Sequence, residues 1–363
     1  MSDNNNWRQD FPALSGTMNG KPLTFLDSGA SAQKPQVVLD AMMGAMRDHY
    51  ANIHRGLYSF SQEMTAEFEA VRGKVARFLN AAENEIVFTR NTTEAINLVA
   101  QSWGRANLKQ GDEIILSEME HHANLVPWQI LAEQIGLTIR YIPVTDDGRL
   151  DMDVFASFLN ERTKMLAFVH ISNVLGTVNP ASEMIKTAKA YNPAIMTLVD
   201  ASQSAVHMAV DVQELGCDFL CFTGHKLYGP NGVGVLYGRY AVLEAMPPYQ
   251  GGGDMIDHVT LEGSTFKAPP ARFEAGTPAI AEVIALGAAI DYVEGIGFEA
   301  IMAHENALSV QLHEIVQGID GVRVIGTAPN KASICAFTID GVHPSDLAAL
   351  LDGAGVAGRT GHH

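Results

Sequence analysis

One lysine, Lys226, stands in a setting that favours amine chemistry. The stretch 217–238 predicts a short apolar strand, a polar loop that contains Lys226, and a second apolar run bounded by glycines. Thr223 and His225 supply hydrogen-bonding groups beside it. Desolvation or a nearby positive group lowers a lysine pKa, and a neutral amine can form a Schiff base with a carbonyl. The alternative is a surface lysine, the better interpretation for a lysine taken at random.

Asp200 is a second candidate, because it closes the apolar strand predicted at 195–199. An unpaired carboxylate there would be costly to bury. A protonated pyridine nitrogen would be a suitable partner. A helix N-cap is the alternative role, and the residues alone do not separate the two.

Thr92 and Thr93 open a predicted helix directly after a strand, where free N–H groups and the helix dipole attract phosphate. A helix cap is the alternative. His121, in the run Glu-His-His-Ala-Asn, can stack on an aromatic ring and pass protons near pH 7. Zinc is the alternative for this histidine pair, but adjacent residues point differently and no third ligand is evident. We therefore predict no metal site.

Arg359 and Thr277 are two further candidates. The guanidinium of Arg359 can hold a carboxylate through two parallel hydrogen bonds, and an ordinary surface arginine is the alternative. Thr277 precedes Pro278, which also fits a plain turn. The run Gly251 to Gly253 predicts either a mobile loop or a tight turn.

Composition limits the classes of function. With 24 basic and 41 acidic residues among 363, the formal charge is −17, which argues against nucleic-acid binding. The polar N-terminus has no secretory pattern and no apolar run approaches membrane-spanning length, so a cytoplasmic location is the default expectation. Three cysteines, Cys217, Cys221 and Cys335, are too few for a disulfide framework, and buried thiols are the better interpretation of the first two.

From about residue 85 the chain alternates short apolar runs with helical patterns, which predicts an α/β fold with a mainly parallel sheet covered on both faces. The predicted strands are 85–89, 113–117, 138–144, 165–172, 195–199 and 219–223. The predicted helices between them are 93–103, 124–135, 152–160 and 182–191. Beyond about residue 285, helices at 282–295, 298–317 and 345–352 and strands at 322–325 and 333–339 predict a smaller α+β domain.

Polar residues follow five of the predicted strands. Because ligands of such sheets bind beyond the carboxyl ends of the strands, these residues predict one site. They are Asn91 to Thr93, His121 and His122, Asn173, Asp200 with Gln203, and Lys226.

The run Thr223 to Pro230 resembles the lysine loop of the class V aminotransferase family, whose lysine carries pyridoxal 5′-phosphate (PLP). Together with Thr-Thr-Glu, Glu-His-His-Ala-Asn, Ser-Asn-Val-Leu-Gly-Thr, Asp-x-x-Gln and Arg-Thr-Gly-His-His, it is most similar to the Suf-type cysteine desulfurases. The resemblance implies a type I PLP-dependent transferase fold with a seven-stranded sheet. It also implies an N-terminal segment 1–20 packed on the small domain, a PLP-binding domain 21–285 and an incomplete small domain 286–363.

The resemblance also implies a role for each candidate. Lys226 would carry PLP, Asp200 would meet its pyridine nitrogen, and His121 rather than His122 would stack on its ring. Arg359 would hold the substrate carboxylate, and Thr277 would meet the phosphate of a second subunit, which makes a homodimer obligatory. The remaining implied ligands are Gln203 and Asn173 at the phenolic oxygen, with Asn173 also at the substrate, and Thr92, Thr93, Thr223 and His225 at the phosphate.

The implied reaction converts L-cysteine to L-alanine and passes sulfur, as a persulfide on a cysteine, to an acceptor protein for iron–sulfur cluster assembly. The family places that cysteine directly after Arg-Thr-Gly-His-His, and the sequence ends at His363. We expect the chain as written to form the Schiff base without completing sulfur transfer. Gly358, before Arg359, is unusual, and its effect on the arginine does not follow from the sequence.

Other readings stay open. A selenocysteine lyase, a kynureninase or an aminotransferase would keep the fold and the cofactor, and a non-catalytic PLP-binding protein would keep only the binding. A dinucleotide-binding protein is disfavoured, because Gly232 to Gly234 lacks the rest of the glycine fingerprint.

Overall fold

The centre of the molecule is a seven-stranded sheet. The structure, a computed structural model, describes residues 6–361. The strands run in the order β4-β10-β9-β8-β7-β5-β6, and β10 alone is antiparallel to its neighbours. The predicted α/β class and the mainly parallel seven-stranded sheet are confirmed. The strands are β4 Ile86–Thr89, β5 Glu113–Ser117, β6 Thr138–Ile142, β7 Thr163–Val169, β8 Met196–Asp200, β9 Phe219–Thr223 and β10 Gly234–Gly238.

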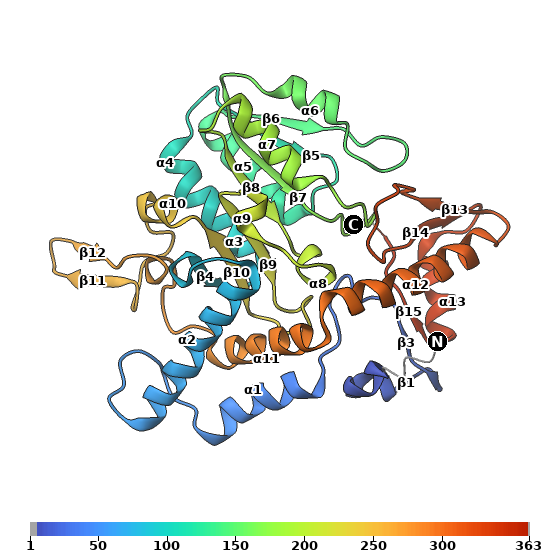
Figure 1. Ribbon diagram of the computed structural model, residues 1–363, viewed down its shortest axis with the longest axis horizontal. Coiled ribbons are helices and arrows are strands. Elements are labelled where there is room, and N and C mark those ends of the chain that lie inside the picture. The colour runs from blue at the N-terminus through green and yellow to red at the C-terminus, as the bar shows by residue number, and fades with distance from the viewer. Residues whose placement is uncertain (1–5, 362–363) are drawn as a thin grey trace.

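Helices cover both faces of this sheet (Figure 1). Alternate residues of β7 show why: Leu166 and Phe168 join one buried cluster, and Met165 and Ala167 join the other. The first cluster contains residues of α2, α7 and α11, and the second contains residues of α3, α5 and α10. The helices of this part of the chain are α1 Gln36–Asp48, α2 Ser59–Leu79, α3 Thr92–Val99, α4 Arg105–Asn107, α5 Val126–Ile135, α6 Met152–Phe158, α7 Ala181–Tyr191, α8 Ser204–His207, α9 Val212–Leu215, α10 Tyr240–Ala245 and α11 Ile280–Ile296.

A smaller group of elements follows α11. It consists of α12 Phe298–Gln317, the antiparallel pair β13 Val322–Ile325 and β14 Ala336–Ile339, α13 Pro344–Gly353 and β15 Val356–Ala357. The N-terminal strand β3, Thr24–Phe25, pairs in parallel with β15. Figure 1 shows β1 and β3 beside α13 and β15. Trp7 packs edge-on against His304 of α12, and Asn19 donates a hydrogen bond to the backbone carbonyl of Asp352.

The bounds of some elements differ from the predicted ones because contacts with distant parts of the chain end or interrupt the element. The helix predicted at 93–103 becomes α3 followed by a π-turn, Ala100–Gly104, in which the Ser102 hydroxyl donates to the carbonyl of Pro247. The strand predicted at 165–172 ends at Val169, because Ile171 instead forms an isolated bridge with Val178. The strand predicted at 333–339 starts at Ala336, since the preceding residues bond to the 176–178 turn.

A separate two-stranded hairpin, β11 Ile256–Val259 with β12 Ser264–Phe266, projects from the body of the molecule (Figure 1). Within residues 6–361, no helix has the combination of length and apolar character that crossing a membrane requires.

A buried arginine joins α2 to the first strand of the sheet. Arg72 donates to both carboxylate oxygens of Glu274, at 2.8 and 3.0 Å, and to the carbonyl of Ile86 at 2.9 Å. Glu274 also accepts from the backbone N–H of Phe88, whose ring lies 4.6 Å from the guanidinium. The Arg72 side chain is only 6% exposed, so its charge is stable there only while both partners are present.

We predict that Arg72→Ala lowers the free energy of unfolding by about 3–5 kcal/mol, because it leaves the Glu274 carboxylate buried without a counter-ion. The matched control is Arg47→Ala, which removes an exposed arginine, 68% accessible, from its pair with Asp48. That change is expected to alter stability little, because ion pairs between exposed side chains contribute little to folding. Urea unfolding followed by circular dichroism measures both, and equal effects of the two changes would contradict the prediction.

Candidate active site

The loop between β9 and β10 holds Lys226 in a fixed conformation. Its two ends are tied by a hydrogen bond from the N–H of Gly224 to the carbonyl of Val233, and Gly229 donates back to the carbonyl of Gly224. Tyr228 has a left-handed backbone with φ of 57°. Such a conformation is costly for a residue other than glycine. The aromatic ring of Tyr228 packs against Phe11 and Tyr292, which holds that conformation in place.

The Lys226 amine is largely desolvated, and desolvation is the main cause that lowers its pKa. The charge of Arg359 lowers this pKa further, and the carboxylate of Asp200 opposes both effects. The His121 pKa is also lowered, mainly by desolvation and then by the charge of Lys226. The charges of Asp200 and Arg359 thus act on the amine of Lys226, and the charges of Lys226 and Asp200 act on the ring of His121.

Asp200 ends strand β8 and is 2% exposed. Its Oδ1 accepts hydrogen bonds from the backbone N–H and the hydroxyl of Ser202, at 2.9 and 2.6 Å. The following helix, α8, has Gln203 rather than Asp200 as its N-cap, so the helix-cap alternative is wrong. Ser202 in turn bonds to the hydroxyl of Thr92 at 2.8 Å. Nothing in the sequence singled out Ser202, whose role depends on this contact between distant segments.

The turn before α3 lies against β10. Asn91 caps the helix by accepting a hydrogen bond from the N–H of Glu94 at 2.9 Å. A Cβ atom on Gly234 would lie only 2.5 Å from the Cα of Asn91, so glycine is required for this close approach. The Thr92 hydroxyl is already bonded to Ser202, whereas the exposed Thr93 keeps its hydroxyl available. The free N–H groups at the start of α3 complete an anion-binding turn.

His121 is held in one tautomer. Its Nδ1 accepts a hydrogen bond from the N–H of Ala123 at 3.1 Å, so the neutral ring carries its proton on Nε2. Behind it, the buried carboxyl group of Glu120 accepts from the N–H of Val169 and from the side chain of Asn124. Burial raises the pKa of Glu120 to about 7. Sequence reasoning missed Glu120, although it directly precedes His121.

Several polar atoms in this region lack a partner in the described part of the chain. Gln203 donates from Nε2 to the carbonyl of Gly29 at 2.8 Å, but its buried Oε1 accepts nothing, and the buried hydroxyl of Thr223 is also unbonded. His225 has its pKa lowered to about 4 by desolvation and the charge of Lys226, so its ring is neutral at pH 7. The unbonded atoms of Gln203 and Thr223 are able to bond a polar ligand.

Of the three remaining predicted residues, only Arg359 has a side-chain partner in the described part of the chain. Arg359 forms a bidentate ion pair with Asp27, a residue that the sequence reasoning missed, with Nε to Oδ1 at 2.9 Å and Nη2 to Oδ2 at 3.0 Å. Thr277 is exposed, and nothing in residues 6–361 connects it to Lys226 within the single chain. Asn173 is half-buried and keeps its side chain free of hydrogen bonds to the described residues.

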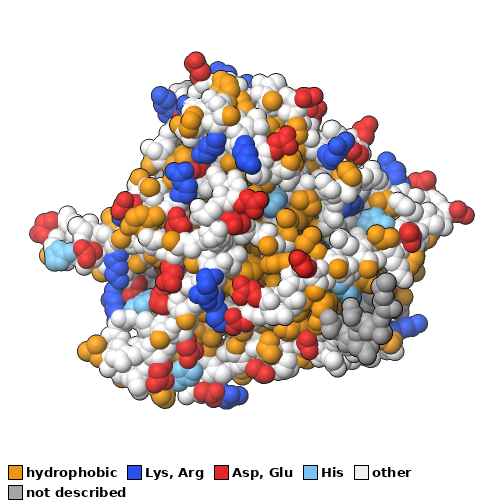
Figure 2. All heavy atoms as spheres, in the orientation of Figure 1, with side chains coloured by type: hydrophobic (Ala, Val, Ile, Leu, Met, Phe, Trp, Pro, Cys, Tyr) orange, Lys and Arg blue, Asp and Glu red, His pale blue; other side chains and the backbone are white. Residues whose placement is uncertain are grey.

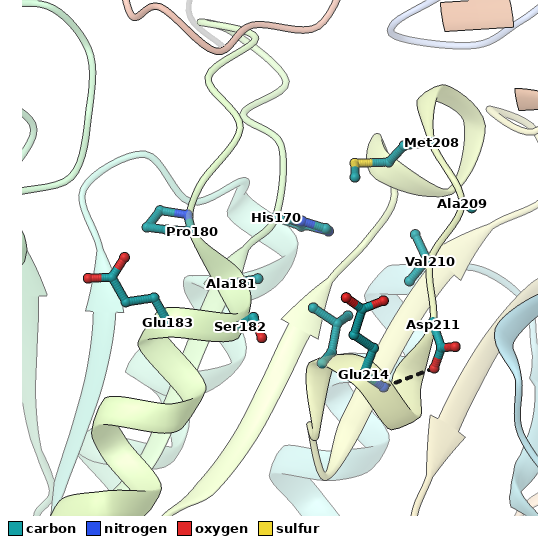
Figure 3. Close-up of a pocket in the computed structure, with 11 residues that line it drawn as sticks. His170, Pro180, Ala181, Ser182, Glu183, Met208, Ala209, Val210, Asp211 and Glu214 are labelled. Carbon is teal, nitrogen blue, oxygen red and sulfur yellow. Dashed lines mark hydrogen bonds between the residues drawn. The ribbon is translucent and has the colours of Figure 1, made fainter. Parts of the chain in front are cut away.

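A cavity of about 380 Å³ lies elsewhere, between α7 and the segment 208–215. In Figure 3 the ring of His170 lies between Pro180 at the start of α7 and Met208. None of the candidate residues above lines it.

On the face in Figure 2 the acidic and basic side chains are interspersed, so that face carries no continuous basic surface of the kind that nucleic acids require. The described residues contain no group of three potential metal ligands.

The residues fit PLP. A desolvated lysine can hold an aldehyde, and a buried carboxylate can face a protonated ring nitrogen. The unbonded amide oxygen of Gln203 can accept from a ring hydroxyl, and the unbonded hydroxyl of Thr223 can donate to a phosphate. When bound, PLP withdraws electrons from the substrate carbon attached to its amine. With the α/β sheet around it, this site defines a PLP-dependent enzyme.

Comparison with known proteins supports the same class, a PLP-dependent enzyme. The family model "Aminotransferase class-V" matches residues 24–363. A cysteine desulfurase of Dickeya dadantii is 50% identical over 98% of this chain and 86% of its own length. The apo structure of a cysteine desulfurase from Thermococcus onnurineus covers 100% of this chain and 89% of that chain, at a TM-score of 0.94 and 38% identity. The structure of a "C-DES" mutant with glycine covalently linked to the PLP cofactor covers 97% of this chain and 91% of that chain, at a TM-score of 0.85 and 26% identity. The chain belongs to the aminotransferase class-V family.

We predict that borohydride fixes PLP on Lys226, and that Lys226→Ala abolishes the labelling. A lowered pKa leaves more neutral amine at a given pH, so Lys226 should react near pH 7 while exposed lysines stay protonated. The strict control is Lys34→Ala. The pKa of Lys34 is lowered to about 8 by desolvation, and its ammonium donates to the carbonyl of His225. Peptide mass spectrometry locates the label, and labelling at Lys34 in place of Lys226 would refute the assignment.

Proposed function

We propose that the chain is a PLP-dependent cysteine desulfurase, which removes sulfur from L-cysteine and leaves L-alanine. The observation that carries this proposal is 50% identity to a cysteine desulfurase across 98% of the chain, together with a desolvated Lys226 near the buried Asp200. Sulfur would pass to a small acceptor protein for iron–sulfur cluster assembly. A cytoplasmic location and the division into segments 1–20, 21–285 and 286–363 belong to the same proposal.

In this proposal the chain's residues hold the cofactor and the substrate at opposite ends of the site. Asp200 would keep a positive charge on the ring nitrogen, and the N–H groups opening α3 with Thr93, Thr223 and His225 would hold the phosphate. The neutral ring of His121 would stack on the cofactor, with a proton on its Nε2 to offer. Gln203 and Asn173 would bond the ring oxygen.

Lys226 has two functions. Its amine would hold the cofactor at rest, and as a free base it would take the proton from the substrate Cα. A lysine with a lowered pKa suits the second function, because its amine is neutral at a pH where an ordinary lysine is protonated. Arg359 holds the substrate carboxylate, which fixes the orientation of that Cα proton towards Lys226.

Sulfur removal requires a thiolate, and the three cysteines of the chain are poorly suited to supply it. Cys217 and Cys221 are buried, and burial raises the pKa of each thiol. Cys335 is half-buried, and burial raises its pKa too. Reactive cysteines have the opposite property, a lowered pKa in an accessible position.

The test is to add L-cysteine to the PLP-loaded chain, with dithiothreitol as an external thiol. We expect a change in the visible absorbance of the cofactor and release of L-alanine, both absent in Lys226→Ala. L-Selenocysteine, L-kynurenine and a standard amino-group donor with a keto acid are compared under the same conditions. A response to one of these and none to cysteine would replace the proposed substrate, and no response to any would indicate a protein that binds PLP without turnover.

We also propose that the active unit is a homodimer in which Thr277 serves the partner's site. Apolar side chains are exposed along the segment before and at the start of α2: Leu57 is 92% accessible, Tyr58 57% and Phe60 47%. The same surface includes Thr277, since Arg55 pairs with Asp254 at 3.0 Å and the carbonyl of Gly253 accepts from Gly276. Exposed apolar residues gathered on one surface favour a protein interface.

Mixing two inactive variants tests this arrangement. Thr277→Asp places a negative charge against the phosphate, and Lys226→Ala removes the reactive amine. If Thr277 acts across the interface, a mixed dimer has one intact site, so remixed subunits should recover about one quarter of the wild-type activity. The control mixes Lys226→Ala with Asp200→Asn, which act in the same site and should recover nothing. Full activity of Thr277→Asp alone, or of a verified monomer, would contradict the proposal.

A further inference from the structure

The first observation concerns the two ends of the chain. Strand β3 pairs in parallel with β15, with Thr24 opposite Val356 and Phe25 opposite Ala357. The N–H of Leu26 donates to the carbonyl of Ala357 at 2.8 Å. Continued by two residues, this register sets Asp27 opposite Arg359, where their side chains form the bidentate ion pair.

The second observation is that Asp27 lies in a segment fixed on both sides. After it, the carbonyl of Gly29 accepts from Gln203, and the N–H of Ala32 donates to the carbonyl of His225. The carbonyl of Asp27 itself accepts from the N–H groups of Ala30 and Ser31. Asp27 is therefore held by backbone contacts to the strand that leads to Arg359 and to the loop that carries Lys226.

The third observation is which edge of the guanidinium is occupied. Asp27 takes the edge formed by Nε and Nη2. Nη1 makes no hydrogen bond to the part of the chain that the structure describes, so the edge formed by Nη1 and Nη2 is available to a second carboxylate. The segment that holds Asp27 is bonded through the N–H of Ala32 to the carbonyl of His225, the residue before Lys226. The charge of Arg359 also lowers the pKa of the Lys226 amine.

We propose that Asp27 is a positioning residue for substrate recognition. It holds the guanidinium of Arg359 by one edge and so presents the other edge to the carboxylate of an amino-acid substrate. The inference rests on the proposed function, in which Arg359 binds that carboxylate. A free arginine side chain would lose its rotational freedom on each binding event, and Asp27 removes part of that cost in advance.

Asp27→Asn tests the proposal. The amide keeps the size of the side chain but turns one acceptor into a donor that faces an N–H of Arg359, and it removes the charge. We expect the dissociation constant for L-alanine and the KM for L-cysteine to rise about 5- to 10-fold, with kcat little changed. Cysteamine and ethylamine, which lack the carboxylate, should bind the two proteins equally. The readout for binding is the visible absorbance of the PLP-loaded protein.

Two further variants separate positioning from a general structural effect. Asp147→Asn disturbs another exposed ion pair, in which Arg149 is 60% and Asp147 33% accessible. The pair of Arg359 and Asp27 is similar, at 55% and 25%. Asp147→Asn should change the binding of neither the carboxylate-bearing ligands nor the amines. Asp27→Glu keeps the charge and should restore part of the preference for L-alanine over ethylamine. It replaces Asp27→Asn in the comparison if thermal unfolding shows that Asp27→Asn is unstable.

The outcomes are distinct. If the wild type binds L-alanine better than ethylamine and Asp27→Asn does the same to an equal degree, the role of Asp27 is refuted while the proposed function stands. If Asp27→Asn binds L-alanine more tightly, Asp27 competes with substrate and the proposal is also wrong. If the wild type does not distinguish the carboxylate-bearing ligands from the amines, Arg359 is no carboxylate site, and this part of the proposed function fails together with the inference.

Discussion

The site depends on keeping a carboxylate and an amine out of water at the same end of the sheet. Asp200 is 2% exposed and has two hydrogen bonds from Ser202 to stabilise its charge. Desolvation lowers the pKa of Lys226, and Asp200 opposes that shift only in part. Desolvation, and after it the charge of Arg359, leave the amine with its pKa lowered in spite of this carboxylate. A protonated heterocycle would give the buried Asp200 a positively charged partner.

The sheet explains why such distant residues meet. Parallel strands bring their carboxyl ends to one edge, so Asn91, His121, Asn173, Asp200 and the Lys226 loop follow β4, β5, β7, β8 and β9 in turn. The antiparallel β10 contributes differently. It returns alongside β9 and β4, and its Gly234 allows the Asn91 turn to approach within contact of its backbone.

Much of this could be predicted from the sequence, because strand cores and the polar residues after them are local patterns. Phe219–Thr223 and Glu113–Ser117 were predicted to the residue, and the buried carboxylate and the reactive lysine were both singled out. Contacts across the chain could not be predicted. The bonds of Ser202 to Thr92, of Gln203 to Gly29 and of Arg359 to Asp27 join residues that no periodicity connects. The role proposed for Thr277 requires a second chain, which a single sequence does not describe.

The segment 24–34 connects the site to both ends of the chain. Its first residues pair with β15 near the end of the chain, and its last residues bond to the backbone of His225. Asp27 and Arg359 are 332 residues apart in sequence, so their pair exists only after both the sheet and the small C-terminal elements have formed. The segment is bonded to β15 through Thr24 and Leu26 and to the Lys226 loop through Ala32. These contacts, together with the bond from Gln203 to Gly29, set where the ion pair lies relative to that loop.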